Sequence, residues 1–325
     1  MCKYKFFEHK ECEYYPCHQL KEINCMFCYC AAYPYFDCPG NPQWLENGIK
    51  DCSSCSYPHV KGHYDDMMDF IIRHTSVYEV QDPQTIKHLY LGWNETMIYS
   101  YLDGCQGKAY VDSLINPMSA MILVGDFCFF AGKPNQNLVY HIKQDFMIIC
   151  YLEKEWEKII EQCYQDQVCK HIRYATKKDT NFDREKLKQY IHQLPDEYQI
   201  KEIDEEIYHQ LLIEDWSKDL CIHYHSYDEM KTFGKCFVIC YGNQIVSGAG
   251  AYAYYKNGIE IEIDTHPSYR KKGLARVIAS QLILECLQND CYPSWDAHNQ
   301  ASLNLAMQLG YEYDGPYQVY LLKRL

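Results

Sequence analysis

The stretch THPSYRKKGLA at residues 265–275 decides the fold predicted for this chain. It joins an alternating, strand-like run to an apolar, helix-like run, and it places Arg270, Lys271 and Lys272 directly before Gly273. The whole chain of 325 residues has a formal net charge of -13, so this basic cluster opposes the charge of its surroundings. A glycine turn from a strand into a helix leaves backbone N–H groups free at the positive helix terminus, which suits a phosphate. The alternative is a simple connection with a solvated basic face.

The residues before this turn predict an antiparallel meander. Residues 236–264 contain three strand-like runs, joined at Gly242-Asn243 and at Asn257-Gly258. Glycine and asparagine together are the strongest short signal of a β-hairpin. The three strands are therefore expected to pair in chain order.

The residues after the turn predict helix, strand and helix. An apolar run over 275–288 has helical spacing, and a short strand is expected over 292–297. The second helix begins at Asn299 and ends at Gly310, which are typical caps at those positions. The predicted fold class is α/β, in an α+β order of meander, turn, helix, strand and helix.

Upstream of the meander the pattern indicates a further α/β region. Buried strands are expected within 118–131, and a helix over 153–172. The polar stretch at 176–190 is a plausible boundary. The sequence thus divides into three predicted parts, 1–65, 70–190 and 191–325.

Composition excludes some classes of function. The longest apolar runs, such as 146–152, fall short of the roughly 18 residues that a membrane helix needs. The N-terminus carries charges throughout and has no apolar run typical of a signal peptide, so a cytoplasmic location is expected. The acidic balance argues against non-specific binding to nucleic acid, which requires neutralisation of phosphates by Lys and Arg.

The order of elements and the residues RKKGLA resemble the GNAT N-acetyltransferase superfamily, whose signature Q/R-x-x-G-x-G/A they match at Arg270, Gly273 and Ala275. Residues 259–311 resemble one bacterial GNAT-like branch, and a fainter resemblance reaches back to about residue 75. It implies transfer of an acetyl group from acetyl-CoA to an amine, either a small molecule or a peptide. The residues that it implies for binding acetyl-CoA are Ile263 and Thr265 on the strand edge, Asn299, and the turn Arg270, Lys271, Lys272, Gly273, Leu274 and Ala275.

The chemistry of acetyl transfer requires a neutral amine, so a base assists, and an acid protonates the departing thiolate. Glu260, Glu262 and Asp264 project from the strand before the turn, and Asp296 lies on the next strand; each is a candidate base or a solvated charge. Many members of the superfamily carry a tyrosine where this chain has Ala306. The alternative function is therefore a GNAT-like protein that binds acyl-CoA without turnover and docks a partner protein.

The first 65 residues are loop-rich and hold nine of the 19 cysteines. In a reducing cytosol, dense cysteines are more often metal ligands than disulfides. Residues 6–59 resemble the cysteine-rich small domain family, a presumed metal-binding module. Six Lys and Arg against seven Asp and Glu in residues 1–63 leave no basic stripe, which favours a structural or protein-docking role over nucleic-acid binding.

Spacing supports a metal in this segment. Two C-x-x-C pairs about two dozen residues apart have the spacing of a zinc ribbon, and four further cysteines could complete a second site. Two zinc ions are predicted, with the ligand pairing open; an iron–sulfur cluster and redox-active thiols are the alternatives. The candidate ligands are Cys12, Cys17, Cys25, Cys28, Cys30, Cys38, Cys52 and Cys55.

Overall fold

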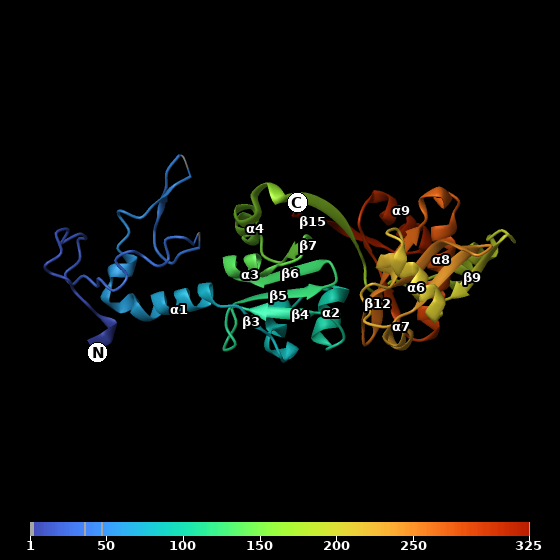
Figure 1. The fold of residues 1–325 in the computed structure, drawn as a ribbon, viewed down its shortest axis with the longest axis horizontal. Helices are drawn as coiled ribbons and strands as arrows, with labels where there is room; N and C mark the ends of the chain where they lie inside the picture. Colours follow the sequence, from blue (N-terminus) through green and yellow to red (C-terminus); the bar gives the residue numbers. More distant parts are fainter. Residues whose placement is uncertain (1–2, 36, 47, 325) are drawn as a thin grey trace.

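A computed structural model describes residues 3–35, 37–46 and 48–324, and these form a loop-rich N-terminal segment followed by two α/β halves (Figure 1). The N-terminal segment contains the short strands β1 (Gln43–Trp44) and β2 (Lys50–Asp51), which pair antiparallel, and three 3-10 turns, η1 (Lys3–Lys5), η2 (Tyr57–His59) and η3 (Lys61–His63). The buried Lys50 side chain connects loops of this segment, because its ammonium donates to the carbonyl oxygens of Ala32, Tyr33 and Tyr35.

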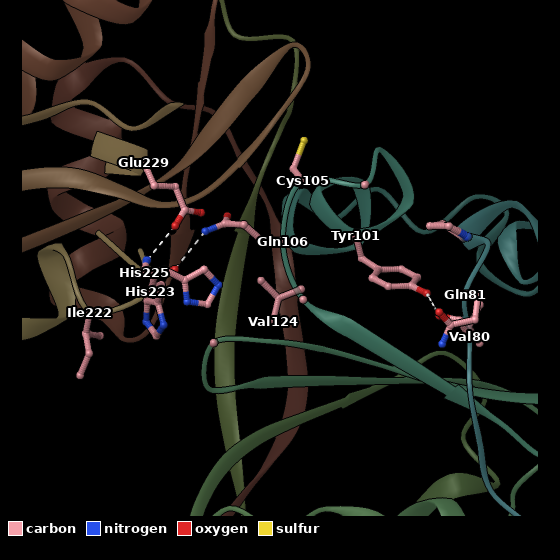
Figure 2. Close-up of a pocket in the computed structure, with 14 residues that line it drawn as sticks. Val80, Gln81, Tyr101, Cys105, Gln106, Val124, Ile222, His223, His225 and Glu229 are labelled. Carbon is pink, nitrogen blue, oxygen red and sulfur yellow. Dashed lines mark hydrogen bonds between the residues drawn. The ribbon is translucent and has the colours of Figure 1, made fainter. Parts of the chain in front are cut away.

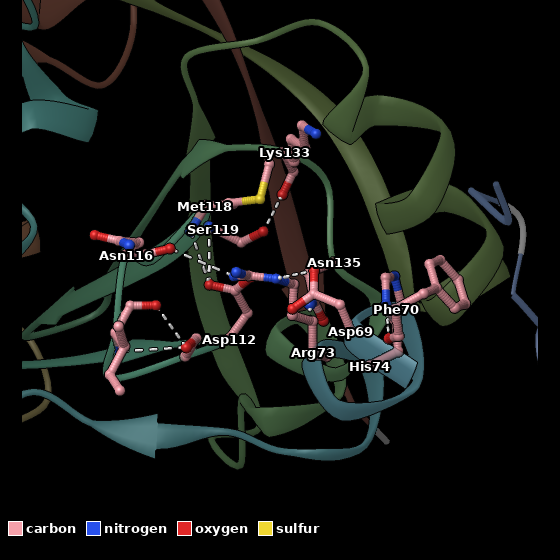
Figure 3. A network of polar contacts seen from close by, with 12 residues as sticks. Asp69, Phe70, Arg73, His74, Asp112, Asn116, Met118, Ser119, Lys133 and Asn135 are labelled. Carbon is pink, nitrogen blue, oxygen red and sulfur yellow. Dashed lines mark hydrogen bonds and ion pairs between the residues drawn. The ribbon is translucent and has the colours of Figure 1, made fainter. Parts of the chain in front are cut away.

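Helix α1 (Tyr64–Thr75) joins the N-terminal segment to the first half, and Figure 3 shows its polar attachment. Arg73 lies 2.8 Å from Asp69 on its own helix and 2.8 Å from the buried Asp112 of the first half. Asn135 donates to the backbone oxygen of Arg73 at 3.0 Å. On the other side, His74 lies 2.7 Å from Asp37. The helix is therefore fixed to both of its neighbours.

The first half is built on an eight-stranded sheet. It confirms the strands expected within 118–131, which are β5 and β6. The helix expected over 153–172 ends earlier, at Tyr164, because Gln165 adopts a left-handed φ of 50° and the following residues pair as strand β8. In sheet order the strands are β14 (Asp296–Ala297), β8 (Val168–Thr176), β15 (Tyr313–Lys323), β7 (Phe146–Tyr151), β6 (Phe127–Gly132), β5 (Ser119–Val124), β4 (Lys108–Val111) and β3 (Tyr78–Glu79). The helices of this half are α2 (Thr96–Leu102), α3 (Gln136–His141) and α4 (Trp156–Tyr164). Its 3-10 turns are η4 (Pro83–Thr85), η5 (Lys87–Tyr90) and η6 (Gln165–Gln167).

The second half confirms the antiparallel meander and the two capped helices after it. Asn299 accepts the N–H of Ser302 at the start of α9, and Gly310 ends that helix in the left-handed conformation. The strand expected over 292–297 is divided at Trp295 between two sheets. The order of strands in the five-stranded sheet is β13 (Tyr292–Ser294), β12 (Gly258–Thr265), β11 (Gln244–Tyr255), β10 (Cys236–Tyr241) and β9 (Tyr198–Glu202). The helices of this half are α5 (Arg184–His192), α6 (Glu205–Ile213), α7 (Tyr227–Phe233), α8 (Leu274–Gln288) and α9 (Gln300–Leu309). Its 3-10 turns are η7 (Lys218–Leu220) and η8 (Pro267–Tyr269).

The two halves repeat one order of strands, and two strands from the C-terminal part of the chain belong to the sheet of the first half. In each, an antiparallel meander is followed by a strand that pairs parallel with the last strand of the meander, β7 with β6 and β13 with β12. The C-terminal strand β15 then lies between β7 and β8 of the first half, and β14 pairs with β8. The sequence boundary near residue 190 therefore does not separate the sheets. No helix in the described ranges is long and apolar enough to cross a membrane.

Candidate active site

The candidate site lies where β12 and the following strand diverge. β12 pairs with β13 over three residues only, from Gly258 to Glu260, and the chain then turns at Trp295 so that β14 joins the other sheet. Beyond Glu260, β12 has β11 as its only strand partner among the described residues, so its second edge is open. A cavity of about 710 Å³ fills the wedge between β12 and β14 and extends to the turn at residues 270–275.

The turn at one end of this cavity is built to hold an anion. Gly273 has φ 81° and caps α8 without any side-chain hydrogen bond. The backbone N–H groups of residues 271–275 donate to no acceptor in the described part of the chain. Arg270, Lys271 and Lys272 are exposed beside them. Because free N–H groups, the helix dipole and three cationic side chains converge here, the turn favours a phosphate or pyrophosphate group.

The open edge of β12 leads from that turn into the cavity. Ile263 and Thr265 line it, and the N–H of Ile263 reaches only the side chain of Glu262, at 3.3 Å. Arg270 donates to the backbone oxygen of Thr265 at 3.1 Å, which fixes the end of the strand against the turn. Asn299 lines the opposite wall, where its Oδ1 caps α9. The nine residues implied for acetyl-CoA thus lie along the turn and both walls of one wedge.

Glu262, Asp264 and Asp296 line this cavity, and the first two of these candidate carboxylates have strongly shifted acidity. Burial, followed by the nearby charges of Asp264 and Asp219, raises the pKa of Glu262 to about 8. Burial and Asp219 raise the pKa of Asp264 to about 6, against an opposing effect of Arg270. A base works best when its pKa lies near the working pH. Glu262 therefore has the acidity of a general base.

The other two, Glu260 and Asp296, belong to a buried polar network. Arg173 on β8 donates to Asp296 Oδ2 at 2.6 Å, and both side chains are under 10% exposed. Tyr317 donates to the same oxygen at 2.8 Å. Glu260 Oε1 accepts the backbone N–H of Asp296 at 2.6 Å, and its second oxygen lies 4.0 Å from the Lys178 ammonium. These contacts link β14 to β8 and to β12.

Three residues of the cavity had no signal in the sequence pattern. Asp126 comes from the turn between β5 and β6, and Asp219 lies in η7, each far from the glycine turn along the chain. Tyr252 is the extra residue of a bulge in β11, and its hydroxyl accepts the backbone N–H of Asp126 at 2.8 Å. Ala306 is buried in α9, whereas Tyr311 donates to the backbone oxygen of Pro293. Tyr252 is thus the tyrosine among the described residues that lines the cavity.

Figure 2 shows a second cavity, of about 540 Å³. His223 lines it, and the His223 ring packs edge-on against Tyr252 with centroids 4.2 Å apart. Gln106 donates to the backbone oxygen of His223 at 3.3 Å, and Glu229 accepts the backbone N–H of His225 at 2.7 Å. Tyr252 lines the first cavity and His223 the second, so this ring contact lies between residues of the two cavities.

The eight predicted cysteine ligands fall into two groups of four. Burial raises the pKa of the Cys28 thiol, and the nearby thiols of Cys25, Cys17 and Cys12 add to the shift. Around Cys52, burial likewise raises the pKa, and the nearby thiols are Cys30, Cys38 and Cys55.

This grouping differs from the pairing of the two C-x-x-C motifs that a zinc ribbon would have. One tertiary contact is consistent with it, because Gly40, in the loop after Cys38, packs against Cys55. In the described ranges no three His, Cys, Asp or Glu side chains are already arranged to hold a metal ion. All eighteen cysteines in these ranges are free thiols.

Comparison with known proteins identifies two families along the chain. The sequence model of the GNAT acetyltransferase family matches residues 87–320, which includes both halves. The model of the cysteine-rich small domain family matches residues 3–81.

Individual relatives are consistent with these matches. The structure of a GCN5-related N-acetyltransferase-like protein from Streptococcus suis 89/1591 is 41% identical, with a TM-score of 0.72, over 75% of this chain and 99% of that chain. The uncharacterized N-acetyltransferase YdfB of Bacillus subtilis (strain 168) is 26% identical over 69% of this chain and 89% of its own length. A probable cobalt-factor III C(17)-methyltransferase of Methanothermobacter thermautotrophicus is 37% identical over 51 residues, 15% of this chain and 14% of its own.

The buried ion pair yields a testable consequence for stability. Replacing Asp296 with Asn leaves the buried Arg173 without its counter-charge, so we expect the free energy of unfolding to fall by about 3–5 kcal/mol. Urea denaturation measures this change. Asp145→Asn, at an exposed position, is the control and should stay within about 0.5 kcal/mol. Equal effects of the two substitutions would contradict the structural role of the pair.

Proposed function

The chain belongs to the GNAT acetyltransferase family and is an N-acetyltransferase, and we propose that it transfers the acetyl group of acetyl-CoA to an amine in the cavity between β12 and β14. The observation that carries this proposal is the row of free N–H groups at residues 271–275, beside three exposed cations and an open strand edge. An anion held at the turn and an amide chain paired along the edge fit a single coenzyme A molecule.

The proposed binding mode assigns a role to each wall. The N–H groups of Lys271 to Ala275 hold the pyrophosphate, and Arg270 and the lysines add charge. The exposed backbone of Ile263 and Thr265 pairs with the pantetheine arm, and Asn299 contacts that arm from the facing wall. The thioester then lies toward Glu262.

A glycine substitution tests this mode. Valine at position 273 would place a side chain among the free N–H groups, so we expect Gly273→Val to weaken acetyl-CoA binding by tenfold or more. Position 273 has a left-handed φ, so valine also costs roughly 1–2 kcal/mol in backbone strain. Gly242→Val is the matched control, because Gly242 has φ 58° and open space around it. Calorimetric titration compares the two, and equal affinity would place the coenzyme elsewhere.

The proposed reaction uses Glu262 as the base. The amine nitrogen attacks the thioester carbonyl carbon, a C–N bond forms, and the C–S bond breaks. The proton lost by the nitrogen goes to Glu262, directly or through water, and the departing thiolate takes up a proton. Tyr252 is the proposed donor, since its hydroxyl hydrogen has no acceptor among the described residues. Asp264 shares the negative field around the base, while Glu260 and Asp296 hold the strand that faces it.

The pKa of Glu262 predicts the dependence of the rate on pH. Below about pH 8 the carboxyl group is protonated and cannot accept a proton, so kcat/KM should rise with pH and level off above that value. Glu262→Gln should lower kcat by roughly 10²-fold or more and remove this inflection, with little change in acetyl-CoA affinity. The exposed Glu197→Gln is the control. An unchanged pH profile in the Gln variant would reassign the base.

The same measurements separate catalysis from mere binding. A protein that binds acetyl-CoA in calorimetry but releases no thiol with any amine would be a binding protein rather than an enzyme. The first half supports a single site per chain, because its link from β6 to α3 (GKPNQN, 132–137) has one lysine in place of the basic glycine turn. We propose that this half is a degenerate copy that closes the acceptor end of the cavity.

For the N-terminal segment we propose two zinc ions, each held by four thiolates. Its support is the grouping of eight cysteines into two sets of four in a segment matched by the cysteine-rich small domain family. Bound zinc would stabilise loops that have little core of their own. Free thiols throughout the described ranges support a reducing, cytoplasmic location.

Double substitutions test both the metal and its ligands. Metal analysis of protein purified without oxygen should give about two zinc ions per chain. Cys12→Ser with Cys28→Ser should leave one zinc, because both lie in one group, whereas Cys28→Ser with Cys52→Ser should leave none. The zinc-ribbon pairing predicts no zinc in the first double variant and one zinc in the second. The exposed Cys169→Ser is the control. A wild-type content near zero, or iron with sulfide, would refute the zinc sites.

A further inference from the structure

The acceptor end of the cavity is lined by four carboxylates from three separate segments. Asp126 comes from the β5–β6 turn, Asp219 from η7, and Glu262 and Asp264 from β12. Arg270 of the basic turn lines the same cavity. The cavity therefore combines cations at the turn, where the coenzyme phosphates are proposed to lie, with carboxylates on the segments where we place the acceptor.

None of these four groups has a cationic partner at ion-pair distance in the described part of the chain. Burial raises the pKa of Asp126 and of Asp264, and the charges of His223 and Arg270 oppose this only in part. Within the described residues, none of the four has a Lys, Arg or His nitrogen within 4.0 Å of its carboxylate. Arg173 also lines the cavity, but its guanidinium forms an ion pair with Asp296. Burial, together with like charges that include Asp219, favours protonation of Asp126, Glu262 and Asp264. An arriving cation would relieve that repulsion.

A second, independent feature is a buried carboxylate oxygen that lacks a hydrogen-bond donor. The Asp296 side chain is 3% exposed and lines the same cavity. Its Oδ2 accepts from Arg173 and Tyr317, but its Oδ1 has no hydrogen-bond partner in the described part of the chain. A buried carboxylate oxygen without a donor costs free energy, so this atom is a ready acceptor for a ligand N–H group.

We propose that the acetyl acceptor is a small aliphatic diamine or polyamine, of which one nitrogen is acetylated near Glu262 while another, as ammonium, is held by Asp126 and Asp219. This inference rests on the proposed function and names the substrate class of the same site. Since the cavity of about 710 Å³ also has to take the end of the pantetheine arm, the remaining space suits a short chain. Acetylation removes one positive charge, so the product binds the carboxylates less well and leaves.

A series of matched amines tests the proposal. The probes are 1,4-diaminobutane, 4-amino-1-butanol and n-pentylamine, which share one reactive amine and differ in the charge at the far end. With saturating acetyl-CoA, thiol release should show kcat/KM at least tenfold higher for the diamine than for either of the others. Calorimetry on the coenzyme A complex should show the same order of affinity, independently of turnover. Equal binding of the diamine and the amino alcohol overturns the proposal.

Substitution in the loop before β10 locates the second ammonium site. Asp219→Asn should weaken diamine binding by about tenfold and leave the affinity for 4-amino-1-butanol unchanged. Asp215→Asn, whose side chain is 97% exposed in the same loop, is the matched control and should keep the preference. A preference that persists in Asp219→Asn overturns this site.

The outcomes distinguish the inference from the function beneath it. If acetyl-CoA binds and the neutral-tailed amines react as well as the diamine, the acetyltransferase stands and the diamine proposal fails. If acetyl-CoA does not bind to the wild-type protein, the proposed function itself fails.

Discussion

The divergence of β12 from the strand that follows α8 is the constraint on which the rest of the structure depends. Three residue pairs join β12 to β13, and the chain then leaves the sheet at Trp295. What holds it away is the contact of β14 with β8, sealed by the buried ion pair of Arg173 and Asp296. Without that contact, β14 could continue along β12 and close the edge that lines the cavity. A buried ion pair contributes little net stability, so its value here is geometric.

This geometry also explains why two halves are needed. The wedge opens within the second half, but β6, β7, β8 and the β5–β6 turn of the first half form its far wall, and the turn and β8 supply Asp126 and Arg173. Because β15 lies between β7 and β8, the wall cannot move away without breaking the sheet. A half that lacks a cofactor turn of its own thus still shapes the acceptor end.

The charges of the cavity follow from the same arrangement. A helix N-terminus with exposed cations borders the cavity, and carboxylates from three segments line it. Burial, and after it the like charges of Asp264 and Asp219, raises the pKa of Glu262 to about 8. A solvated glutamate on an isolated strand would ionise near its usual value. Burial in the wedge and the carboxylates of β12 and η7 therefore set the acidity of the candidate base.

The sequence by itself determined the local features. Hairpin turns at Gly242 and Gly258, helix caps at Asn299 and Gly310, and the turn at 270–275 depend on residues close in the chain, so periodicity and turn chemistry predict them. Only the tertiary structure decided that β14 and β15 join the other sheet, that Asp126, Asp219 and Tyr252 meet Glu262, and that the cysteines group as they do. These depend on contacts between distant segments, and residue order carries no local signal for them. Glu260 and Glu262 show the difference, because both project from one strand, yet Glu260 lies beside Lys178 and Glu262 lines the open wedge.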